Sequence, residues 1–225
     1  TQQNGLYNVK RDSDGVLRFL FSLNTNGTIG GGYRGSGGSP DIDFTTGTGN
    51  ALFRDQSAWY HIVVNYDTTD STAANRLKLF VNNVQHALTF TSDIPQNTVF
   101  PTNTNGEIIE IGHTYDNGDG YQNGARGYLC EMAFVDGQQL APTEFGEYDS
   151  DTPNVWKPKD ISDITFGTLG FYYEFKNSGA LGTDSSGNSN TATVQGTPIQ
   201  TTDTCTNNSA NLLTFTGGNT NVDGR

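Results

Sequence analysis

Alternation of apolar and polar residues predicts a hairpin in the first half of the chain. In RLKLFVNN, residues 76–83, the side chains of Leu77, Leu79 and Val81 fall on one face, which is the pattern of a half-buried strand. The preceding stretch SAWYHIVVNYD, residues 57–67, is rich in β-branched and aromatic residues and predicts a strand buried on both faces. Because a polar turn separates the two stretches, we expect them to pair.

Further segments carry strand patterns, whereas helix patterns are nearly absent. The predicted strands are VLRFLFSL (16–23), GEIIEIGH (106–113), YLCEMAFVDG (128–137) and LGFYYEF (169–175). The segment at 128–137 is apolar on both faces and is expected at the centre of a sheet. Only PTEFGEY, residues 142–148, is expected to form a helical turn, because proline favours the first helical position.

Two segments lack any core-forming pattern. NTNGTIGGGYRGSGGSP, residues 24–40, has glycine at seven of 17 positions and is predicted to be a loop or an irregular edge. Residues 177–225 are almost free of charged and large apolar side chains. We therefore predict an all-β antiparallel sandwich over residues 1–176, followed by an extended C-terminal segment or linker over 177–225. This segment is expected to pack on the sandwich or to lead to a further module, and it could also wrap a neighbouring subunit.

Composition supports the β class and excludes some partners. Aromatic residues make up 11% of the chain, and 28 glycines fit strands and turns better than helices. The net charge of −12 and the pI near 4.4 argue against nucleic acid and anionic membrane surfaces, which need clustered cations. No apolar run approaches the length of a membrane span, so no membrane insertion is expected. The chain begins at Thr1 and ends in NVDGR, and we expect a fragment or a processed product.

Cysteine, tryptophan and histidine positions favour structural roles. Two cysteines, Cys130 and Cys205, are too few for a disulfide framework. Cys130 is expected to be a buried thiol within its strand, and a bond between the two cysteines is the open alternative. Trp59 and Trp156 are expected to anchor the core or a sheet. His61 is expected to pack within a strand, because no two histidines lie at metal-ligand spacing on one element.

The carboxylates of residues 106–113 do not form a glycosidase pair. Retaining glucanases built on sandwiches carry their carboxylates at alternating positions of one strand face. Glu107 and Glu110 are three residues apart, so they are expected on opposite faces. We therefore expect no enzymatic activity from this pair.

Polar loops supply candidate ligand-binding residues. Tyr33 and Arg34 lie in the glycine-rich segment, and the loop YDNGDGY supplies Asp116, Asp119 and Tyr121. Aromatic rings beside carboxylates and amides suit sugar binding, so these five residues are the predicted carbohydrate contacts. The spacing within the loop fails the EF-hand pattern, and both a cation site and a solvated turn stay open there.

Several blocks resemble one family. FRDQSAWYHIVVNYDTTDSTAANRLKLFVNN, ARGYLCEMAFVDGQQLAPTEFGEYD, NVWKPK, GTLGFYYEF, LGTDSSGNSN and TDTCTNN are similar, in this order, to concanavalin A-like lectin/glucanase (laminin-G-like) domains of the type found in structural proteins of tailed bacteriophages. The resemblance spans residues 52–210 and implies a β-sandwich of jelly-roll type. It implies a place on the virion, in a tail fibre, another tail appendage or a capsid-surface decoration.

The resemblance also implies partners and a possible metal. Related domains bind carbohydrate, and some hold calcium at the rim of the sandwich. The segment GTDSSGNSN then makes Asp184 and Asn188 candidate calcium ligands, although a turn that begins the C-terminal segment is an open alternative. We expect a non-enzymatic virion protein, forming a homo-oligomer, that serves assembly with other virion subunits and adhesion to host-surface glycans. A subunit-interaction module without ligand, and a polysaccharide-degrading enzyme, are the alternatives.

Overall fold

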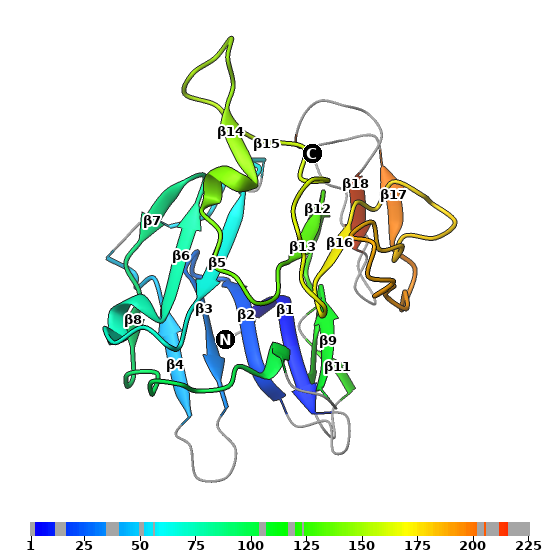
Figure 1. The fold of residues 1–225 in the computed structure, drawn as a ribbon. Helices are drawn as coiled ribbons and strands as arrows, with labels where there is room; N and C mark the ends of the chain where they lie inside the picture. The colour runs from blue at the N-terminus through cyan, green and yellow to red at the C-terminus, as the bar shows by residue number, and fades with distance from the viewer. Residues whose placement is uncertain are drawn as a thin grey trace. The chain divides into compact units, whose positions relative to one another are not determined.

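The fold is built almost entirely of short β-strands (Figure 1). The computed structural model describes residues 3–11, 17–34, 41–49, 52–55, 57–103, 107–116, 120–122, 124–201, 205 and 212–215. The strands are β1 (Gln3–Arg11), β2 (Leu17–Asn24), β3 (Ile29–Tyr33), β4 (Ile42–Thr45), β5 (Ile62–Tyr66), β6 (Leu77–Val81), β7 (Val84–His86), β8 (Thr89–Phe90), β9 (Glu107–Ile111), β10 (Thr114–Asp116), β11 (Gly120–Gln122), β12 (Gly127–Leu129), β13 (Met132–Phe134), β14 (Gly146–Tyr148), β15 (Trp156–Pro158), β16 (Phe171–Tyr173), β17 (Ile199–Thr201) and β18 (Leu212–Phe215). The short 3₁₀ helices are η1 (Ala73–Asn75), η2 (Pro101–Asn103) and η3 (Pro142–Glu144).

These elements confirm the predicted all-β class with antiparallel pairing. They are consistent with a sandwich, while the jelly-roll topology stays a prediction. The helical turn expected at Pro142 is present as η3. In the part of the chain that the structure describes, no helix has the length and apolar character needed to span a membrane.

The chain divides into two compact units, and the division differs from the boundary expected at residue 176. The first unit comprises Thr1–Gln56, Val64–Leu79 and Gln85–Ala125, and the second comprises Ser57–Val63, Phe80–Val84 and Arg126–Arg225. A three-stranded sheet has the order β5-β6-β7. In that sheet Leu77, Leu79 and Val81 are buried as the alternation predicted.

The first unit contains a six-stranded sheet with the order β8-β4-β3-β2-β1-β9. Strand β3 lies inside this sheet, although its sequence IGGGY belongs to the segment predicted to be a loop or irregular edge. That prediction is wrong because the glycines permit a close backbone approach. A Cβ on Gly31 would lie 1.8 Å from the carbonyl oxygen of Leu20, so only glycine fits there.

Aromatic side chains fill the core of the first unit. Phe19 packs on Phe44 with ring centroids 6.1 Å apart, and Phe100 stacks on Tyr66 at 4.2 Å. Fully buried aliphatic residues complete this core: Val9, Ile29 and Ile42. The phenylalanine and tyrosine side chains of β1–β4 bury a large apolar area, although β3 itself is rich in glycine.

The second unit holds smaller antiparallel pairs. The strand predicted over 128–137 is interrupted at Cys130 and Glu131, so that β12 joins the sheet β12-β18-β17 and β13 pairs with β16. Because β17 and β18 come from the segment 177–225, part of that segment is built into the sheet with β12. A hydrophobic cluster of the second unit is formed by Ile161, Phe166 and Tyr172, with Ala133 and Phe145 packed against it.

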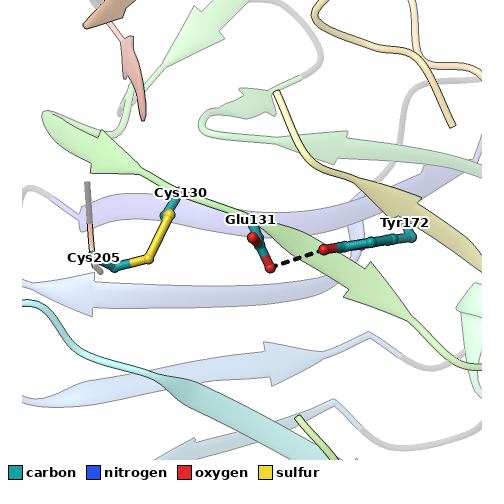
Figure 2. The surroundings of a disulfide bond; sticks show 4 residues. All are labelled: Cys130, Glu131, Tyr172 and Cys205. Atoms are coloured by element: carbon teal, nitrogen blue, oxygen red, sulfur yellow. Dashed lines mark hydrogen bonds between the residues drawn. A yellow bond between two sulfur atoms is a disulfide. The ribbon is translucent and has the colours of Figure 1, made fainter. Parts of the chain in front are cut away.

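A disulfide joins Cys130 to Cys205 across 75 residues of sequence (Figure 2). The expectation of a buried thiol at Cys130 is therefore wrong. Cys130 follows β12 and Cys205 lies between β17 and β18, so the bond fastens the C-terminal strands to the strand with which they pair.

Candidate ligand-binding surface

The β14–β15 pair of the second unit is amphipathic. Its register places Tyr148 opposite Trp156 and Gly146 opposite Pro158, so these residues share one face. The Tyr148 and Trp156 rings meet edge to face, with centroids 5.0 Å apart. Gly146 leaves room for the indole, because a Cβ there would lie 2.7 Å from the Trp156 ring.

The opposite face of the same pair is charged. Lys157 forms ion pairs with Glu147 at 3.6 Å and with Asp149 at 3.1 Å. Its hydrogen bond with Asp149 raises the pKa of Lys157. Asp149 also accepts hydrogen bonds from the backbone N–H groups of Asp151 and Thr152, which shapes the connecting loop. The pair thus separates an aromatic face from a charged one.

His61 holds the Trp156 indole in place. The Nε1–H of Trp156 donates to Nδ1 of His61 over 2.9 Å. Since an indole nitrogen can only donate, Nδ1 must be the acceptor, and the proton of the neutral imidazole lies on Nε2. Burial lowers the pKa of His61 and so favours this neutral form. Within the described residues, Nε2 has no hydrogen-bond partner.

The backbone of His61 is fixed by Asn82. The N–H of His61 donates to Oδ1 of Asn82 at 2.9 Å, and the N–H of Asn82 donates to the carbonyl oxygen of His61 at 2.9 Å. Asn82 adopts a positive φ of 48°, which asparagine tolerates better than most residues. Both backbone polar groups of His61, its N–H and its carbonyl oxygen, are therefore bonded to Asn82, which fixes the position of the imidazole.

Trp59, two residues before His61 in the chain, forms a second aromatic pair of the second unit with Tyr128. It is 37% exposed and lies 6.2 Å from Tyr128, measured between ring centroids. Tyr148 is 50% exposed. We call these residues together the aromatic surface: Trp59, His61, Tyr128, Tyr148 and Trp156. Exposed rings beside an imidazole donor suit a ligand that has both an apolar face and hydroxyl groups.

The sequence did not predict this surface, since Trp59 and Trp156 were expected to anchor the core or a sheet. The 37% exposure of Trp59 corrects that expectation for Trp59. Trp156 is partly buried and packs within the β14–β15 pair, as a sheet anchor would. A usable signal was present in GEYDSDTPNVWKP, where the turn-forming run DSDTPN separates two aromatic segments. That pattern predicts a hairpin with Tyr148 and Trp156 near its loop.

Of the five predicted carbohydrate contacts, the structure describes the side chains of Tyr33 and Arg34. Tyr33 is only 4% exposed and packs against Phe100, so the structure assigns its ring to the core of the first unit. Arg34 forms an ion pair with Asp43 at 2.7 Å. Asp116 and Tyr121 belong to the paired strands β10 and β11, but their side chains lie outside the described part, as does Asp119 entirely.

The segment GTDSSGNSN forms a tightly hydrogen-bonded loop next to β16. The carboxylate of Asp184 accepts four hydrogen bonds, from the N–H groups of Tyr172, Ser186 and Asn190 and from the Ser186 hydroxyl, at 2.8–2.9 Å. Burial is the largest single influence and would raise the pKa of Asp184, but the four hydrogen bonds together lower that pKa. Asp184 therefore fixes the loop to β16.

Asn188 uses its amide nitrogen within the same loop. Its Nδ2 donates to the carbonyl oxygens of Gly167, at 2.5 Å, and Gly170, at 2.9 Å. Calcium binds oxygen ligands, whereas here the amide presents its nitrogen to the neighbouring turn. Among the described residues, no group of three or more His, Cys, Asp or Glu side chains is placed to hold a metal ion. Calcium binding by Asp184 and Asn188 stays a prediction.

Glu107 and Glu110 make separate ion pairs in the first unit. Glu107 lies 3.8 Å from Arg18, whereas Glu110 pairs with Lys10 at 2.5 Å and approaches His113 at 3.5 Å. Burial opposes ionisation of Glu110 most strongly, yet the contacts with His113 and Lys10 together lower its pKa. The two carboxylates thus have different partners.

Glu131 lies beside the disulfide in the second unit, as Figure 2 shows. The hydroxyl of Tyr172 donates to Oε2 of Glu131 at 3.0 Å. Burial raises the pKa of Glu131, and the nearby carboxylates of Glu174 and Asp160 raise it further. Because Met132 is opposite Tyr173, continuing the register places Glu131 across from Glu174. Sequence spacing did not reveal this pair, since its members are distant along the chain.

Comparison of the chain with family models, with characterised proteins and with solved structures gives no match. The functional conclusion therefore depends on the residues and on their geometry.

Proposed function

We propose that this chain is a non-enzymatic structural protein of a tailed-bacteriophage virion, in a tail fibre, another tail appendage or a capsid-surface decoration. There it assembles with other virion subunits and attaches to glycans on the host surface. The sequence blocks similar to concanavalin A-like virion domains and the antiparallel β fold support this proposal. The aromatic surface is the observation that carries it, because exposed rings on a rigid strand pair suit attachment.

The disulfide supports a location outside a reducing cytoplasm. Disulfides persist mainly in oxidising environments, and Cys130–Cys205 joins the end of β12 to the segment between β17 and β18. Repeated copies on a particle would also raise the avidity of a weak site, by about 10² to 10⁴. A homo-oligomeric appendage would gain this avidity, because it presents several copies of the site.

The direct test places the chain in the particle. Antibodies against the chain should label the outer surface of intact virions, and the same antibodies should reduce adsorption of those virions to host cells. Labelling confined to disrupted particles would contradict the proposed location. Unchanged adsorption under saturating antibody would contradict the attachment role while leaving assembly in place.

Polysaccharide hydrolysis is the second candidate, and Glu131 is the observation that favours it. A general acid needs a raised carboxyl pKa, and a retaining glycosidase also needs a second, ionised carboxylate nearby. Glu174, which the strand register places across from Glu131, is the candidate second carboxylate; it accepts a hydrogen bond from the Ser185 hydroxyl and pairs with Lys176, both at 2.5 Å. Release of reducing sugar from host polysaccharide, abolished by Glu131→Gln, would establish this candidate in place of the first.

A further inference from the structure

We infer that the aromatic surface binds a neutral oligosaccharide, with Tyr148 and Trp59 stacking on sugar rings and the Nε2–H of His61 donating to a sugar oxygen. This inference rests on the proposed attachment function and names the ligand class and its contacts. The residues belong to one unit of the chain, so the surface is complete within that unit.

The size of the exposed rings fits a small ligand better than a protein partner. A tryptophan or tyrosine side chain presents about 150–250 Å². With 37% of Trp59 and 50% of Tyr148 exposed, the two rings offer about 200 Å² in total. A stable protein interface buries about 800 Å² on each partner. The exposed area of the two rings is therefore about a quarter of the area that a stable protein interface buries on one partner. One ring is enough to stack on one sugar.

Charge favours a neutral glycan over an acidic one. The chain carries a net charge of −12, so it repels a polyanionic saccharide at separations up to about one Debye length. The lysine of the strand pair does not offset this effect, because Lys157 lies on the face opposite Tyr148 and is already paired with Glu147 and Asp149. The aromatic face offers rings and a neutral imidazole.

The geometry is fixed before a ligand arrives. Trp156 is held by its hydrogen bond to His61 and by its close packing over Gly146, and Tyr148 meets its ring edge to face. Because Nδ1 of His61 accepts from the indole, the remaining ring proton lies on Nε2, where a donor to a hydroxyl is useful. A preformed surface loses little side-chain entropy on binding.

The experiment titrates the purified full chain with defined saccharides and follows tryptophan fluorescence. The neutral probes are laminarihexaose, cellohexaose and chitohexaose, and polygalacturonate is the acidic comparator. We expect saturable binding of at least one neutral probe and none of polygalacturonate. Absence of binding to all neutral probes by a multimerised chain, or preference for the acidic one, would overturn the inference.

Variants then localise the site. Tyr148→Ala should weaken binding at least tenfold, whereas Val155→Ala should leave it unchanged, because Val155 is 48% exposed on the opposite face of the same strand pair. His61→Asn keeps an oxygen that accepts from Trp156 and removes the Nε2–H, so it should weaken binding severalfold without changing the unfolding midpoint. Equal effects of Tyr148→Ala and Val155→Ala would overturn the proposed site.

The two proposals fail in different ways. If the chain binds host cells and Tyr148→Ala binds them equally well, the inference fails and the attachment role stands. If virions do not carry the chain on their surface, the proposed function fails even where the purified chain binds a saccharide.

Discussion

The Asp184 carboxylate provides the sharpest test of how the second unit is held together. In the wild-type chain the N–H of Asn190 donates to Oδ2 of Asp184 at 2.8 Å. Asp184→Asn retains one oxygen and replaces the other with an NH₂ group, which cannot accept this hydrogen bond. A hydrogen bond to a charged group contributes about 1.5–3 kcal/mol. Asp184 is partly exposed, so solvent screening reduces this value, and we expect a loss of about 2 kcal/mol in the free energy of unfolding.

Urea unfolding measures this loss. With a denaturant dependence of about 2 kcal/mol per molar, the midpoint should fall by about 1 M. Thr191→Ala is the matched control, because Thr191 is exposed in the same loop and its side chain makes no hydrogen bond within the described residues. A shift no larger for Asp184→Asn than for Thr191→Ala would refute the bracing role. A calcium-dependent rise in midpoint that Asp184→Asn abolishes would instead identify a calcium ligand.

The effect should depend on pH in a defined direction. The pKa of Asp184 is lowered in the folded state, so its stabilisation is fully present above the ordinary aspartate pKa of 3.8. It is lost as the pH falls through the lowered folded-state pKa. The difference in stability between the wild-type chain and Asp184→Asn should therefore be constant at neutral pH and shrink below about pH 4. A difference that grows on acidification would contradict this reasoning.

Three further perturbations have defined outcomes. Gly31→Ala should lower the free energy of unfolding by about 3 kcal/mol or more, whereas Gly49→Ala, with nothing within 4 Å of the added Cβ, should be nearly neutral; equal urea midpoints would contradict the close packing of β3. Reduction of the Cys130–Cys205 disulfide, which spans 75 residues, should cost about 4 kcal/mol in urea unfolding with and without reductant, and an unchanged midpoint would show that the bond is dispensable. Burial lowers the pKa of His61, so its stabilising effect is full above the ordinary value of 6.5 and declines as the pH falls below it. Tryptophan fluorescence of the wild-type chain should change on acidification below that pH, and His61→Asn should remove the change; identical profiles would refute the contact.

Local patterns predicted the strands that bury one face. The alternation at Leu77, Leu79 and Val81 identified β6, because a period of two on a half-buried strand is a property of neighbouring residues. Strand β2 was found from the apolar run at residues 19–21, which is also a property of neighbouring residues. Antiparallel class and the helical turn at Pro142 followed from composition and from proline geometry.

Features that depend on distant partners were missed. Glycines at 30–32 indicate a loop when only neighbours are considered. Here Gly31 is required by the approach of the Leu20 carbonyl, and Gly30 by the approach of the Phe44 carbonyl. The pairing of β18 with β12 and the Cys130–Cys205 bond join positions far apart in sequence, and no local pattern encodes them. Likewise, alternation shows that two strand faces differ but does not say which face meets solvent, so the exposure of Trp59 was not predictable.

The Cys130–Cys205 bond also determines how the chain would respond to mechanical load. A force that pulls on the C-terminus first strains β18, which lies beyond Cys205, and then reaches the sulfur bridge. There the tension crosses to Cys130, so the 75-residue stretch between the cysteines is bypassed and its contour length, about 260 Å when extended, is not released. Pulled in this direction, the oxidised chain extends only until the disulfide carries the load. The reduced chain extends further, because the stretch between the cysteines can unfold.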